Sequence, residues 1–108
     1  AVLNAAFAEY PRFREEYIDA YDNEDAQMAA QVAPPLDSPG QLNYVMGLFA
    51  VFVHRVEKGG VGYVGFEFGC VWEKEHGLGV MTHKNRVIDI GAAYSAFDSH
   101  RASEDAAG

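Results

Sequence analysis

The sequence predicts a single α+β domain: two N-terminal helices and a short third helix packed on a four-stranded antiparallel β-meander. Two sequence patterns predict this fold. Apolar residues recur at helical spacing in the first part of the chain, and β-branched and aromatic runs separated by turn signals follow it. With 108 residues, of which 49% are hydrophobic and 22% charged, the chain is long enough for one compact core. We divide this domain into a helical acidic region and loop (1–37), a β-meander region (38–100) and a polar tail (101–108).

Two short helices are predicted at the N-terminus, at about residues 2–10 and 11–22. Apolar residues keep helical spacing on both sides of Pro11, at Leu3, Phe7, Tyr10, Phe13, Tyr17, Ala20 and Tyr21. The fixed φ of proline suits the first turn of a helix, so Pro11 is expected to begin the second one. Residues 23–37 lose this period and are expected to form a connecting loop.

The segment Ser38-Pro39-Gly40-Gln41 predicts the start of a short helix that ends at about Met46. Ser38 can cap the helix, Pro39 can occupy its first position, and Gln41 can reach back to the cap. This helix leads into the first strand.

Four segments have the composition of strands, and they are residues 48–56, 61–72, 78–83 and 86–91. Gly59-Gly60 and Lys84-Asn85 supply tight turns, so the segments form two hairpins. A two-residue loop at Gly59-Gly60 aligns one apolar face, with Val53 opposite Phe66, Val51 opposite Phe68 and Phe49 opposite Cys70. The other face carries small residues, including Gly65 and Gly69, and the N-terminal helices are expected to cover part of it. A helical turn at Tyr94 to Phe97 and a frayed tail complete the prediction.

The charge of the chain favours a basic partner. Sixteen acidic and eight basic residues give a net charge of −8, which disfavours binding to nucleic acid or to anionic membranes. Residues 1–40 hold eight acids and two bases, a net charge of −6. The residues expected to face a protein partner are Glu15, Glu16, Asp19, Asp22, Glu24 and Asp25. The single cysteine and the lack of a signal peptide in this sequence favour the cytoplasm.

The most distinctive stretch runs from Phe68 to Val80 and reads F-x-C-x-W-E-x-E-H-G-L-G-V, with a later Val87-Ile88-Asp89-Ile90-Gly91 strand. It resembles the signature of a family of small bacterial domains of unknown function. The signature residues are Phe68, Cys70, Trp72, Glu75, His76, Gly77 and Gly79. The resemblance implies no reaction and no catalytic residue. Some related small acidic proteins look like immunity proteins of toxin systems, which implies a protein-binding role against a basic toxin.

Two pairs of residues are candidates for catalysis. His54 and Glu67 become diagonal neighbours if residue 54 pairs with 65 and residue 52 with 67, and Glu75 lies beside His76. We expect no metal site and no cofactor, because Cys70 and the histidines lack the paired short spacing of zinc ligands. The function hypothesis is therefore a non-enzymatic, immunity-like binding protein, and the alternative is a small enzyme or metal-binding domain that uses this His/Glu set.

Overall fold

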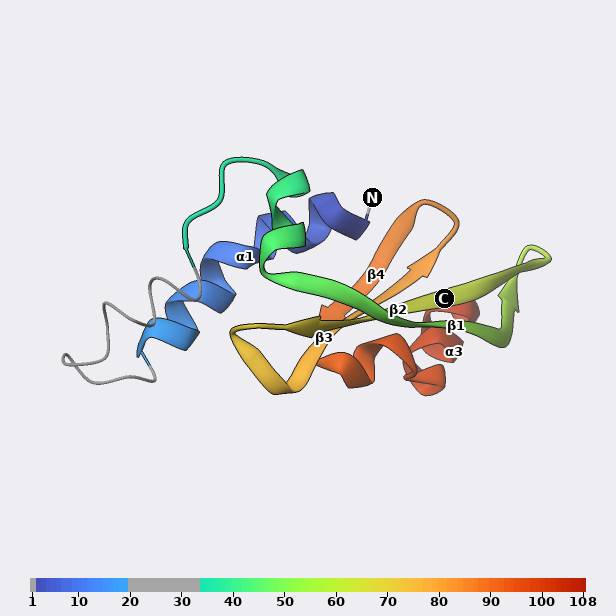
Figure 1. Ribbon diagram of the computed structural model, residues 1–108. Helices are drawn as coiled ribbons and strands as arrows, with labels where there is room; N and C mark the ends of the chain where they lie inside the picture. Colours follow the sequence, from blue (N-terminus) through green and yellow to red (C-terminus); the bar gives the residue numbers. More distant parts are fainter. Residues whose placement is uncertain (1, 20–33) are drawn as a thin grey trace.

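A computed structural model describes residues 2–19 and 34–108, which form an antiparallel sheet with helices on both faces (Figure 1). The sheet order β1-β2-β3-β4 confirms the predicted four-stranded meander. In chain order the elements are α1 (Val2–Asp19), the 3₁₀ helix η1 (Pro39–Tyr44), β1 (Met46–Lys58), β2 (Val61–Cys70), β3 (Glu73–His83), β4 (Arg86–Gly91), the 3₁₀ helix η2 (Ala93–Ala96) and α3 (Ser99–Ala107).

The prediction of two N-terminal helices is wrong, because α1 runs unbroken from Val2 to Asp19 with Pro11 inside it. A proline inside a helix removes one backbone hydrogen bond and costs about 3 kcal/mol. Aromatic packing on both sides of Pro11 offsets this cost. The ring centroids of Tyr10 and Phe13 lie 5.3 and 6.2 Å from that of Trp72, so both halves of the helix are held on the sheet.

The predicted frayed tail at residues 101–108 is also wrong, because most of it belongs to α3. The side chain of Asp98 accepts a hydrogen bond from the backbone N–H of Arg101 at 3.1 Å and caps the helix. Ala102 is fully buried against the sheet. The helical turn expected around Tyr94 is present as η2.

The short helix that precedes β1 is a 3₁₀ helix, and its capping differs from the prediction. Ser38 makes no side-chain cap. The side-chain oxygen of Gln41 instead accepts a hydrogen bond from the backbone N–H of Asp37 at 2.6 Å, one residue before the expected position.

The register of the first hairpin agrees with the prediction only next to the turn. Lys58 pairs with Val61 across the two glycines, but an irregularity between Val53 and Glu57 then shifts the pairing by two residues. The observed partners are Val53 with Val64 and Val51 with Phe66, and after a second irregularity Leu48 with Phe68 and Met46 with Cys70. The first shift, of two residues, keeps each side chain on its face of the sheet, and the second irregularity adds a shift of one residue.

Each face of the sheet has its own core. The larger core lies under α1 and η1 and contains Ala6, Tyr10, Leu42, Val45, Met46, Phe68, Cys70, Trp72, Leu78 and Val80. The smaller one lies under α3 and contains Tyr63, Met81 and Ala102. The N-terminal helix therefore covers the opposite face from the one expected, and η2 and α3 cover the face with the small residues (Figure 1).

One carboxylate of α3 binds side chains of two strands. Asp105 accepts two hydrogen bonds from the guanidinium of Arg86, at 3.2 and 2.7 Å, and one from the hydroxyl of Tyr63 at 2.5 Å. Lys58 donates to the backbone carbonyl of Asp105 at 3.3 Å. Burial, followed by the bond to Asp105, raises the pKa of Tyr63. These contacts fasten α3 across β1, β2 and β4.

Asp105→Asn is expected to reduce the amount of stability that the fold loses as the pH is lowered. The hydrogen bonds from Arg86, and then that from Tyr63, hold the pKa of Asp105 well below its ordinary value of 3.8. A carboxyl with a lowered folded-state pKa stabilises the fold fully above its unfolded pKa, and this contribution is lost as the pH falls through the folded pKa. Urea midpoints measured from about pH 7 to about pH 2 should therefore fall less steeply in the variant below about pH 4.

Arg86→Ala leaves the Asp105 carboxyl in place and removes its strongest partner. It should flatten the same profile in the same direction, because the pKa of Asp105 then moves back toward its ordinary value. Profiles as steep as that of the wild type in both variants would contradict the role given to this carboxylate.

Candidate functional site

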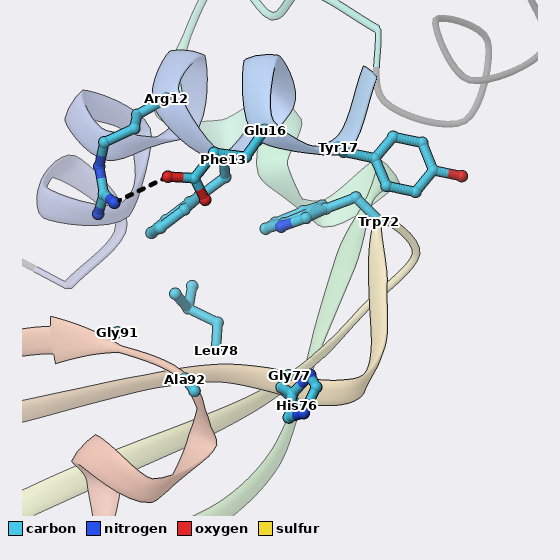
Figure 2. Close-up of a pocket in the computed structure, with 10 residues that line it drawn as sticks. All are labelled: Arg12, Phe13, Glu16, Tyr17, Trp72, His76, Gly77, Leu78, Gly91 and Ala92. Atoms are coloured by element: carbon cyan, nitrogen blue, oxygen red, sulfur yellow. Dashed lines mark hydrogen bonds and ion pairs between the residues drawn. The ribbon is translucent and has the colours of Figure 1, made fainter. Parts of the chain in front are cut away.

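An open groove of about 670 Å³ lies between α1 and the end of the sheet (Figure 2). Its volume is within the range of about 300–1,000 Å³ that is typical of ligand sites. Three parts of the chain line it: α1, the β2–β3 connection with the start of β3, and the end of β4. The lining residues are Arg12, Phe13, Glu16, Tyr17, Trp72, His76, Gly77, Leu78, Gly91 and Ala92.

The floor of the groove is aromatic. Tyr10, Phe13 and Tyr17 are spaced three and four residues apart, which places them on one face of α1. Trp72 follows β2 and is 8% exposed, with the Phe13 ring stacked on it. Figure 2 shows Phe13 and Trp72 side by side beneath α1, with Leu78 below them and His76 on the far wall. The aromatic side chains of Phe13, Tyr17 and Trp72 thus line the groove on the side of α1.

The rim of the groove on α1 carries a small charge network. The guanidinium of Arg12 bonds Glu9 at 2.9 Å and Glu16 at 3.3 Å, and it lies 4.9 Å from the centroid of the Phe13 ring. The hydrogen bond to Glu9 is the main cause that raises the pKa of Arg12, so the guanidinium stays charged. Two carboxylates against one cation leave this rim with a net charge of −1.

The structure does not bring the four candidate catalytic residues together in the groove. His76 lines it, whereas Glu75 is exposed on β3. The ring of His54 contacts the carbonyl oxygen of Ala96 at 2.9 Å. Glu67 pairs with Ala50 on β1, whereas residue 52 was expected opposite it, so the diagonal arrangement with His54 does not form.

Among the side chains that the structure describes, no three His, Cys, Asp or Glu residues form a group that could hold a metal ion. Two of the residues considered for zinc have other contacts. The ring nitrogen of His83 lies 3.0 and 3.2 Å from the carbonyl oxygens of Lys58 and Val61, and buried Cys70 donates to the carbonyl of Phe68 at 3.8 Å. These two side chains support the strands around them.

A comparison with known protein families assigns the chain to one of them. A family model for a domain of unknown function, DUF6985, matches residues 1–97. The chain belongs to the DUF6985 family. The match confirms the expected membership in an uncharacterised domain family, and it spans all the residues that line the groove. No curated protein and no solved structure matches the chain. In the part of this DUF6985 domain that the structure describes, no helix has the length and apolar character needed to cross a membrane.

The residues of the distinctive stretch from Phe68 to Val80 lie in the core and beside the groove. Phe68, Cys70 and Trp72 belong to the larger core. Gly77 has φ +62°, and a Cβ there would lie 2.7 Å from the Phe68 carbonyl oxygen. A Cβ at Gly79 would lie 2.5 Å from the carbonyl oxygen of Ala92. Trp72, His76 and Gly77 of this stretch thus form one wall of the groove. Gly79 lets the chain after β4 pack closely against β3.

The acidic residues expected to face a partner fall into three groups. Glu15 and Glu16 are exposed on α1, and Glu16 lines the groove. Asp19 is the last residue of α1. Asp22, Glu24 and Asp25 lie outside the described residues.

Sequence reasoning missed the groove itself and the roles of Arg12 and Phe13. The helical stripe at Tyr10, Phe13 and Tyr17 was a usable signal, but it is equally typical of a helix that only covers a core. The partner of that stripe, Trp72, lies more than fifty residues away in the sequence.

Proposed function

We propose that this DUF6985 domain is a non-enzymatic binding protein that holds a basic segment of a protein partner in the groove under α1. One observation carries the proposal: the aromatic floor of Phe13 and Trp72 lies beside the carboxylate of Glu16, in a chain of net charge −8. Aromatic faces and carboxylates together bind guanidinium and ammonium groups.

Arg12 is an example, within the chain itself, of a guanidinium bound by carboxylates and an aromatic ring. Its guanidinium is held between two carboxylates and over the Phe13 ring. An arginine or lysine of the partner would meet the same types of group in the groove, where the carboxylate of Glu16 lies near the rings of Phe13 and Tyr17. The planar guanidinium suits such a site better than an ammonium, because it both stacks on rings and forms paired hydrogen bonds.

The charge distribution of the chain also supports a basic partner. The net charge of −6 from the eight acids and two bases of residues 1–40 attracts cations over a distance of about 10 Å at ordinary salt. Attraction of this kind raises the association rate, and it weakens as salt is added. The groove then supplies the short-range contacts.

The finer form of the proposal is a bacterial, cytoplasmic, immunity-like protein that blocks a basic toxin by covering its cationic surface. It is supported by the resemblance of small acidic bacterial proteins to immunity proteins and by the acidic N-terminal region. Co-expression with the product of the neighbouring gene tests it, because toxin and immunity genes usually lie side by side. Protection of the host by the wild type, and its loss with Glu16→Gln, is the expected result.

Glu16→Gln is expected to weaken binding of arginine-rich peptides about tenfold, because it removes the carboxylate that lines the groove. The single tryptophan, Trp72, lies in the groove and reports binding through its fluorescence. The probe is a set of synthetic peptides of defined sequence, with acidic peptides of equal length for comparison. Binding should weaken further as salt is added.

The matched control is Glu15→Gln, which makes the same change of charge on the neighbouring residue of α1, outside the groove. It should change affinity by less than about twofold. Equal losses in the two variants would show attraction by charge alone, and a lack of saturable binding by every cationic peptide would contradict the proposal.

A further inference from the structure

The outer strand of the sheet carries an uncovered apolar row. Phe49, Val51 and Val53 occupy alternate positions of β1 and are 76%, 49% and 77% exposed. The register places Val51 and Val53 opposite Phe66 and Val64, on the face that α1 covers elsewhere. Because α1 packs against β3 and β4, it leaves these three side chains of β1 exposed.

Such a row is unusual on an edge strand. A strand at the edge of a sheet has unpaired backbone N–H and C=O groups, and natural proteins generally protect such edges with charges, bulges or covering segments. Contiguous exposed apolar residues on a folded protein commonly mark an interface. β1 combines both features over its 13 residues.

We propose that β1 pairs in antiparallel fashion with β1 of a second copy of this chain, and that Val51 lies on the two-fold axis of the dimer. The apolar row is symmetric about Val51, so reversal of the strand places Phe49 of one copy opposite Val53 of the other. The same register places Arg55 opposite Gly47, where a Cβ would have no neighbour within 4 Å, so the long side chain has room. The strand is therefore complementary to its own copy.

The distribution of charge favours a second copy at this edge. Two chains of net charge −8 repel each other, but β1 itself carries Arg55 and Lys58 against Glu57. The acidic α1 packs on β3 and β4, away from the β1 edge. Two copies that meet along β1 thus approach through the surface where their repulsion is weakest.

The exposed area is sufficient for a modest dimer. With Tyr44 and Leu48, which are also exposed, the row presents on the order of 600 Å² per copy, given about 150–250 Å² for each aromatic side chain. Two copies together could bury at most about 1,200 Å², the lower limit of standard interfaces, so we expect a weak, reversible dimer. Two-fold symmetry uses the β1 edge of both copies, so assembly stops at two.

Sedimentation of the full chain at about 10–500 µM tests the dimer. The wild type is expected to form dimers reversibly. Val51→Lys and Val51→Glu should each weaken association about 100-fold, because each variant places two like charges face to face on the axis. An equimolar mixture of the two variants should form dimers again, because lysine then faces glutamate.

The matched control is Val61→Lys, an exposed valine of the inner strand β2, which should associate like the wild type. Thermal unfolding at low concentration establishes that each variant folds. Four outcomes would overturn the proposal: a monomeric wild type throughout the range, open-ended aggregates in place of dimers, equal losses in the residue 51 and residue 61 variants, or no recovery in the mixture.

Discussion

Gly65→Ala is expected to lower the free energy of unfolding by about 3 kcal/mol, the upper end of the usual cost of overpacking. A Cβ at this position would lie 1.6 Å from the carbonyl oxygen of Ala96 and 2.5 Å from its carbonyl carbon. Both atoms belong to backbone, so no side-chain rotation relieves the clash. The same carbonyl oxygen contacts the ring of His54 at 2.9 Å, and movement of η2 would break that contact too.

Gly69→Ala is the matched control for this substitution. Gly69 lies on the same strand, and a Cβ there would meet nothing within 4 Å. The change should leave stability unchanged or raise it by about 0.5 kcal/mol, because alanine lowers the entropy of the unfolded chain. Urea unfolding followed by circular dichroism measures both variants. Similar midpoints for the two would mean that η2 does not pack against Gly65 as described.

Trp72→Ala is expected to destabilise the fold by about 3–5 kcal/mol, the usual cost of truncating a buried tryptophan. The indole joins α1 to the sheet, because the rings of Tyr10 and Phe13 both pack on it. Its loss also leaves the helix with an internal proline and no aromatic partner. Backbone amides of α1 should therefore exchange with solvent faster than those of β2 and β3, as measured by hydrogen exchange.

Tyr44→Ala is the control for loss of an aromatic side chain, because Tyr44 is 80% exposed. It should change stability by no more than about 0.5 kcal/mol. If Trp72→Ala changed stability as little as the control does, or accelerated hydrogen exchange in α1 no more than the control does, the indole would not be the link between helix and sheet.

The strands were predictable because their signals are local. Alternating apolar residues and the Gly59-Gly60 and Lys84-Asn85 turns fall within each hairpin, and Lys84 adopts the positive φ of 57° that a tight turn can require. The bulge after Val53 was not predictable. His54, in the bulged segment, contacts Ala96, a residue 42 positions away in the chain.

Both helix errors have a common physical cause. Local preference favours a break at Pro11 and disorder in a small, polar C-terminal segment. Tertiary contacts outweigh both preferences, through Trp72 in the first case and through Asp105 in the second. The residues next to each segment in the sequence give no indication of these contacts.

The candidate site was predictable only in part. The signature drew attention to Trp72 and His76, which do line the groove, and the acidic pattern drew attention to Glu16. The pairing of His54 with Glu67 failed because it depended on a register that the bulge changes. The groove required knowledge of where α1 lies on the sheet, which the sequence pattern does not contain.

The three contacts of Asp105 also bear on the order of events during synthesis. Tyr63 and Lys58 precede Asp105 by 42 and 47 residues. All four strands come before α3 in the sequence, so they leave the ribosome before α3 does. Tyr63 and Met81, which α3 later buries, therefore stay open to water while the strands pair. Until α3 folds, the sheet face that carries Tyr63 and Met81 exposes apolar surface, and such surface makes a folding chain prone to aggregation.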